Sequence, residues 1–159
     1  MVELALKSLS AEGLDRALDK AAHYRLLNDP EPAESICLDV LDADPANRRA
    51  KVLLLLTLTD QASSANKLRD ARAVLAKLDD PYDVAYFGGL IAEREARMQL
   101  ARGAADRHVA RAFAEALACF ERAEALRPSG NDDCLLRWNS CVRTLRRHGI
   151  TLREGEAED

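Results

Sequence analysis

Apolar residues recur at helical spacing along most of the chain and are separated by short polar turns that contain proline or glycine. In the first segment Leu14, Leu18 and Ala21 share one helical face, and the turn Asn28-Asp29-Pro30 follows. Residues three and four apart lie on the same side of an α-helix, so this spacing predicts amphipathic helices. The same reasoning predicts seven helices, over about residues 10–27, 31–44, 47–59, 64–78, 82–101, 109–126 and 131–148.

Local signals refine these helices. Asn47 is a predicted N-cap, and Pro32 suits the first turn of a helix, where its missing N–H costs nothing. Residues 47–59 are apolar on nearly all sides, which predicts burial between neighbours. Two adjacent glycines, Gly88 and Gly89, cost the fifth helix about 1 kcal/mol each relative to alanine. We therefore expect another backbone to pass close to them.

The residue composition supports an all-α fold. The 159 residues include 28 alanines and 25 leucines but only 14 isoleucines, valines and threonines together. Alanine and leucine favour helix, whereas β-branched residues favour strands. The length allows one domain of ordinary size. We expect a single helical domain over residues 1–152 and a disordered acidic tail over residues 153–159.

Helix pairs closed by a proline suggest a repeat. Pro45, Pro81 and Pro128 follow an acidic or basic residue at intervals of 36 and 47 residues. These intervals divide the chain into units of about 14–45, 46–81 and 82–128. Small, aromatic and proline residues recur within the outer units: Ala21, Tyr24, Ala33 and Pro45 in the first, and Ala116, Phe120, Ala123 and Pro128 in the third.

With these residues the chain resembles the tetratricopeptide repeat (TPR) family, whose unit is a helix, a turn and a helix over about 34 residues. Cys37 replaces a usual large residue, and Leu58 replaces the aromatic residue of the middle unit. The third unit is longer than one repeat. We expect an elongated fifth helix and a long loop over residues 103–109 to take up this length.

The resemblance implies antiparallel helix pairs stacked as a right-handed superhelix of about seven helices. Residues 131–148 would form the C-terminal capping helix, and the first helices of the pairs would line a concave groove. The candidate partner-binding residues on that face are Asp15, Leu18, Ala22, Arg25, Arg49, Val52, Leu56, Glu93, Arg94 and Arg97. A groove of mixed polarity suits a peptide or an amphipathic helix. The alternative is an ordinary solvated face with repeat packing.

One TPR subfamily clamps the C-terminal carboxylate of chaperone tails with lysine and asparagine. Leu18 and Ala22 occupy the first two of those positions here. The clamp is therefore absent, and a heat-shock chaperone tail is not the expected ligand.

Charge is distributed unevenly along the chain. The net charge is -4, of which residues 153–159 contribute -3. Residues 29–44 contain six acidic residues and no basic one, whereas Arg137, Arg143, Arg146, Arg147 and Arg153 make the far end basic. The helix dipole accounts for part of this pattern. The alternative function is a structural scaffold that self-associates through its acidic and basic ends, which makes the chain a homo-oligomer.

Residue patterns for catalysis or metal binding are missing. His23, His108 and His148 lie in distant segments, and no glycine-rich loop carries the lysine that a nucleotide requires. Cys134 and Cys141 are two helical turns apart, about 10 Å, too far for a disulfide. We expect all four cysteines to be small apolar core residues. The sequence predicts no enzyme, no cofactor and no metal.

The expected setting follows from charge and hydropathy. A negative net charge argues against a nucleic-acid partner. Apolar runs such as Val52–Leu56 are far shorter than the roughly 20 residues that span a bilayer. The first ten residues lack a secretory pattern, so we expect a cytoplasmic protein. The leading interpretation is a non-catalytic module that binds a protein or peptide partner, as an adaptor or a client-specific chaperone.

Overall fold

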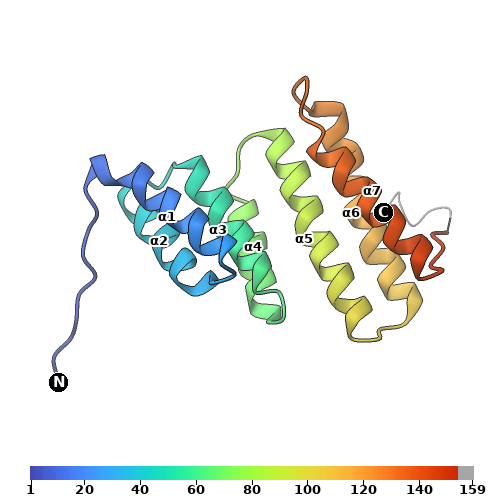
Figure 1. Cartoon of the computed structure of the whole chain (residues 1–159), viewed down its shortest axis with the longest axis horizontal. Coiled ribbons are helices and arrows are strands. Elements are labelled where there is room, and N and C mark those ends of the chain that lie inside the picture. The colour runs from blue at the N-terminus through green and yellow to red at the C-terminus, as the bar shows by residue number, and fades with distance from the viewer. Residues whose placement is uncertain (154–159) are drawn as a thin grey trace. The chain divides into compact units, whose positions relative to one another are not determined.

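The computed structural model describes residues 1–153, in which the regular secondary structure is helical and no strand occurs (Figure 1). A short 3-10 turn, η1 (Ala11–Gly13), precedes seven α-helices: α1 (Leu14–Leu26), α2 (Pro30–Ala43), α3 (Arg48–Asp60), α4 (Ala65–Leu75), α5 (Pro81–Ala101), α6 (Asp106–Leu126) and α7 (Asp133–Arg147). The predicted all-α fold is confirmed. Apart from Arg153, the predicted tail lies outside the described residues.

The chain divides into two compact units, residues 1–61 and residues 62 onward. We call them unit 1, which holds α1, α2 and α3, and unit 2, which holds α4 to α7. The border falls in the turn after α3, inside the predicted middle repeat. Both a continuous superhelix and a single domain therefore stay predictions.

Unit 1 packs around small residues at the contact between α1 and α2. Ala21 and Ala33 are fully buried, as their positions in the repeat pattern predict, and Cys37 is buried beside them in sequence. Leu18, Val40 and Ala50 join the three helices in one apolar cluster. The Asn47 cap is confirmed, because its side-chain oxygen accepts a hydrogen bond from the Ala50 N–H at 2.9 Å.

Unit 2 is built on α5 and α6, which are 21 residues each and joined by the short connection 102–105. Such a connection makes the helices antiparallel neighbours. Phe113 and Phe120 of α6 lie at the centre of the core, and α7 packs on the same cluster through Cys134, Cys141 and Leu145. The long loop predicted over 103–109 is wrong. Helix α6 begins at Asp106, so the extra length lies in helices rather than in a loop.

The glycine pair in α5 accommodates a side chain rather than a backbone. A Cβ atom on Gly89 would lie 2.5 Å from Cε1 of Phe120, whose ring is 1% exposed. A Cβ atom on Gly88 would meet nothing closer than Leu75 Cδ2 at 3.5 Å, an ordinary contact. The expected close approach exists, but the predicted backbone partner is wrong. Only Gly89 is required to be small.

Candidate functional site

A buried carboxylate joins α5 to α7 in unit 2. The Glu93 side chain is 3% exposed, and its Oε2 accepts hydrogen bonds from Arg97 Nε and from Arg137 Nη2, both at 2.9 Å. Burying a charge is costly unless it is paired and hydrogen-bonded, and here one anion is paired with two cations. The local charge is therefore positive.

The Arg97 guanidinium extends this arrangement across α7. It donates from Nη1 to Thr144 Oγ1 at 2.9 Å and from Nη2 to Ser140 Oγ at 3.0 Å. Its central carbon also lies 5.8 Å from the centroid of the Phe113 ring, a cation–π distance. We call Glu93, Arg97, Arg137, Ser140 and Thr144 the Glu93 network. It fixes α7 against α5 through polar contacts in addition to the apolar core.

Four partly buried side chains follow one side of α5 next to this network. Tyr86, Leu90, Arg94 and Arg97 are four, four and three residues apart, which places them within one helical stripe. We call these four residues the α5 stripe. The ring of Tyr86 stacks on that of Tyr82 with centroids 5.7 Å apart. The stripe thus presents aromatic, apolar and cationic groups in succession.

The two arginines of the α5 stripe differ in what they bind. Arg97 is engaged by the Glu93 network, whereas Arg94 forms no hydrogen bond or ion pair with any described residue. The pKa of Tyr86 is raised to about 12, chiefly by burial and also by Asp133, with Arg137 acting in the opposite direction. Its phenol is therefore a neutral hydrogen-bond donor at physiological pH. Arg94 is the cation that is left available.

The candidate residues of unit 1 serve mainly to join α1 to α3. Arg25 binds Asp60 with two hydrogen bonds, at 2.6 and 3.2 Å, and Arg49 binds Asp19 at 2.7 Å. Leu18 is fully buried in the core of unit 1. Of the remaining candidates, Asp15 is exposed, and Ala22, Val52 and Leu56 are partly buried. The structure brings the two helices together but gathers no free polar cluster there.

In unit 2 the structure unites Glu93 with Arg97, two of the three candidates predicted there. Sequence reasoning missed the partners that α7 contributes. A signal was present, because Arg137, Ser140 and Thr144 are three and four residues apart and form a polar stripe along α7. Such a stripe beside buried Cys141 indicates a buried polar contact rather than a solvated face.

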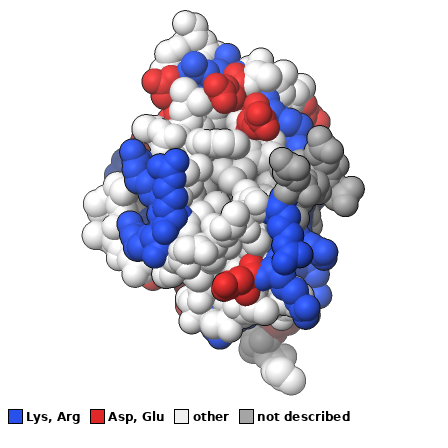
Figure 2. All heavy atoms as spheres, turned by 90° about the vertical axis from the view of Figure 1, so that its right-hand side faces the viewer, with Lys and Arg blue, Asp and Glu red and all other residues white. Residues whose placement is uncertain are grey.

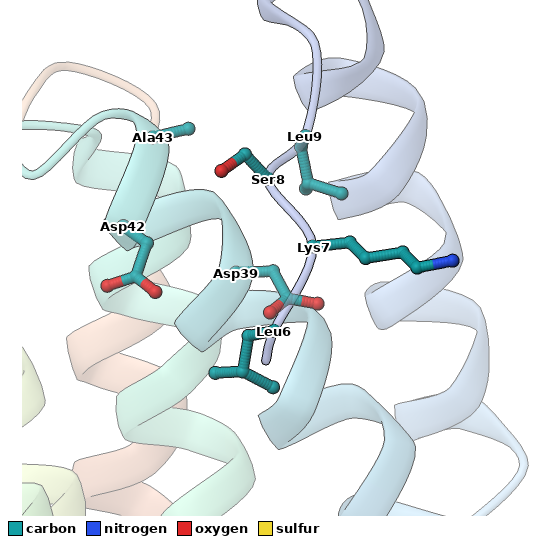
Figure 3. A pocket seen from close by; sticks show the side chains of 7 residues that line it. All are labelled: Leu6, Lys7, Ser8, Leu9, Asp39, Asp42 and Ala43. Carbon is teal, nitrogen blue, oxygen red and sulfur yellow. The ribbon is translucent and has the colours of Figure 1, made fainter. Parts of the chain in front are cut away.

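A shallow hollow lies beside the N-terminal segment in unit 1 (Figure 3). Its volume is about 130 Å³, and it is lined by Leu6, Lys7, Ser8, Leu9, Asp39, Asp42 and Ala43. In Figure 3 the Lys7 amino group points away from both carboxylates. A second hollow of about 380 Å³ shares Leu6 and Asp39 and is otherwise lined by Glu31, Glu34, Ser35 and Leu38. Neither contains a nucleophile paired with a base.

All four cysteines are buried and unpaired, which confirms their predicted place in the core. No three potential metal ligands cluster anywhere in residues 1–153. Within the same range no helix combines the length and the apolar character that crossing a bilayer requires. Comparison with family models, with curated proteins and with solved structures finds no match.

The buried thiols make stability dependent on pH above 9. The pKa of Cys141 is raised from 9.0 to about 12, chiefly by burial and also by Glu93, with Arg97 acting in the opposite direction. The unfolded chain therefore loses this proton near pH 9 while the folded chain retains it. The contribution of the Cys141 thiol to the free energy of unfolding is fully present below pH 9. It decreases as the pH rises towards 12, by at most about 1.4 kcal/mol per pH unit for one thiol. Urea unfolding on both sides of pH 9 measures this slope.

Cys141→Ala is the matched variant for this experiment. It should show a smaller fall in stability above pH 9 than the parent chain, whatever its stability at neutral pH. Equal slopes in the two chains would show that the Cys141 thiol does not contribute.

Proposed function

We propose that the chain is a non-catalytic protein-interaction module and that the α5 stripe of unit 2 binds a segment of a partner protein. The observation that carries this proposal is Arg94, a partly buried cation with no partner among residues 1–153, beside apolar Leu90 and aromatic Tyr86. An arginine next to aromatic and apolar groups is typical of the residues that dominate protein interfaces. Such a surface is complementary to a peptide that presents a carboxylate and an apolar side chain.

The dimensions of the α5 stripe also suit a peptide. Tyr86 to Arg97 spans 11 residue steps of helix, a length of about 16 Å. An extended segment of about five residues has the same length. Arg137, whose side chain is 38% exposed, adds positive charge beside the stripe. The expected ligand is therefore a short acidic segment with apolar anchors rather than a small molecule.

We further propose that the helix pairs α1–α2 and α5–α6 are TPR-like units. Buried alanines in both pairs, Ala21 and Ala33 in one and Ala116 and Ala123 in the other, support this assignment. An adaptor or a client-specific chaperone is the role that the α5 stripe serves.

Selection from a displayed peptide library on the immobilised full chain tests the proposal. We expect enrichment of peptides that combine acidic and apolar residues, and fluorescence anisotropy then measures their affinity. Arg94→Ala should weaken binding by about tenfold, or 1.4 kcal/mol, because the peptide carboxylate loses its cation. Arg69→Ala, an exposed arginine of α4, is the matched control and should leave the affinity unchanged. Failure to enrich any peptide, or equal affinities of both variants, would contradict the proposal.

A further inference from the structure

Two segments of the chain carry charge of opposite sign. Residues 29–44, which contain α2, carry six acidic residues and no basic one. Residues 137–153, which contain most of α7, carry five arginines and no acidic residue. The two segments belong to different units. The two segments are therefore complementary in charge.

The helix dipole explains only part of this distribution. Acidic residues at a helix start and basic ones at its end are favourable, which suits Glu31 in α2 and Arg147 in α7. Asp42, however, lies in the last turn of α2, and Asp44 is its C-cap residue. Negative charge at that end opposes the dipole, and no basic residue in the last turn offsets it. The acidic surface of α2 therefore costs stability within its own helix.

The exposed side of α2 combines these charges with an apolar group. Glu31, Leu38 and Asp42 lie seven and four residues apart, which places them on one stripe of the helix. Leu38 is 50% exposed and lines the larger hollow with Glu31 and Asp39. We call this surface the α2 face. It is uneven rather than flat, because the two hollows lie on it.

Beyond Asp133 in its first turn, the exposed side of α7 combines positive charges with an apolar group. Leu136, Arg143 and Arg147 are seven and four residues apart, and Leu136 is 64% exposed. Neither arginine forms an ion pair or a hydrogen bond within the described part of the chain. We call this surface the α7 face. Figure 2 shows lysine and arginine side chains gathered in two bands on the side of the molecule that carries α7, with uncharged surface between them.

We propose that the α7 face of one copy of this chain binds the α2 face of a second copy. Each face offers one exposed leucine on the same stripe as two charges that the other face neutralises. Because the two faces are different surfaces, the contact is heterologous, and it continues into a ring or an open chain of subunits.

Sedimentation velocity of the full chain over a wide concentration range tests this contact. At low salt the average mass should rise with concentration, and at high salt the chain should remain monomeric, because exposed charges are screened. Arg143→Glu with Arg147→Glu should weaken association at low salt by tenfold or more, since two attractions become repulsions. Arg16→Glu with Arg69→Glu changes the net charge equally at exposed sites elsewhere and should have little effect.

A mixing experiment decides which faces meet. The chain with Arg143→Glu and Arg147→Glu retains its α2 face, and the chain with Glu31→Arg and Asp42→Arg retains its α7 face. Neither should associate alone, but an equal mixture should form at least a heterodimer through the one unaltered pair of faces. Circular dichroism verifies that both variants are folded. The α5 stripe is independent of this result, because Arg94→Ala should not change the average mass.

Several results would overturn the proposal. If the chain stays monomeric at low salt, the contact between the α2 and α7 faces does not form. This holds even if the α7 arginines bind a polyanion such as heparin. Association that does not change with salt, or that survives both pairs of charge reversals, uses other surfaces. A mixture of the two variants that remains monomeric shows that the α2 and α7 faces do not recognise each other.

Discussion

Replacement of Glu93 by alanine is expected to lower the free energy of unfolding by about 3 kcal/mol. The substitution leaves Arg97 and Arg137 without their shared carboxylate, and removing one partner of a buried ion pair costs roughly 3–5 kcal/mol. The two arginine side chains are 31% and 38% exposed, so water compensates part of the loss and the lower end of that range applies. Chemical denaturation followed by circular dichroism measures the change.

Glu95→Ala is the matched control for this prediction. Glu95 lies two residues further along α5 and binds Arg72 at 2.7 Å, but both side chains are more than a third exposed. Exposed ion pairs contribute at most about 1 kcal/mol, so this variant should be close to the parent chain. A Glu93→Ala variant no less stable than Glu95→Ala would show that the Glu93 network does not stabilise unit 2.

The destabilisation caused by Glu93→Ala should also be confined mainly to α7. The network joins α5 to α7, so hydrogen exchange of α7 amides should accelerate more than that of α6 amides in Glu93→Ala. Glu93→Gln keeps a hydrogen-bond acceptor without the charge, and its stability should lie between that of the alanine variant and that of the parent chain. Uniform acceleration across unit 2 would indicate general loosening rather than release of α7.

Gly89→Ala and Gly88→Ala are expected to change stability in opposite directions. A methyl group at position 89 would lie 2.5 to 3.0 Å from three atoms of the Phe120 ring, which is fully buried and cannot move aside. Overpacking of this kind costs typically 1–3 kcal/mol, more than the roughly 1 kcal/mol that alanine gains over glycine in a helix. At position 88 the methyl group fits, so only the gain in helix propensity remains.

Thermal and urea unfolding of the two variants test this pair directly. We expect Gly89→Ala to be less stable than the parent chain and Gly88→Ala to be more stable by up to about 1 kcal/mol. A double-mutant cycle with Phe120→Leu isolates the cause, because a smaller side chain should reduce the cost of Gly89→Ala. If both alanine variants were stabilised equally, the close packing of Phe120 on Gly89 would be wrong.

The agreement between sequence and structure depends on the range of the interactions involved. The Asn47 cap and the buried alanines follow from patterns within a few residues, and both were predictable. Three other features depend on distant residues. The partner of Gly89 is 31 residues away, Leu136 in the last predicted helix is exposed, and the connection before α6 is shorter than its spacing suggests.

The sequence by itself determined the seven helices, the Asn47 cap and the small side chains where helices cross, because hydrogen bonds from residue i to i+4 and the period of 3.6 residues are local properties. Only the tertiary structure decided which polar side chains form contacts within the chain. Arg137 binds Glu93 from 44 residues away and Arg97 binds Thr144 from 47 residues away, and no local pattern encodes these pairings. It is this pairing that distinguishes Arg94, which keeps its charge for a partner, from Arg97, which does not.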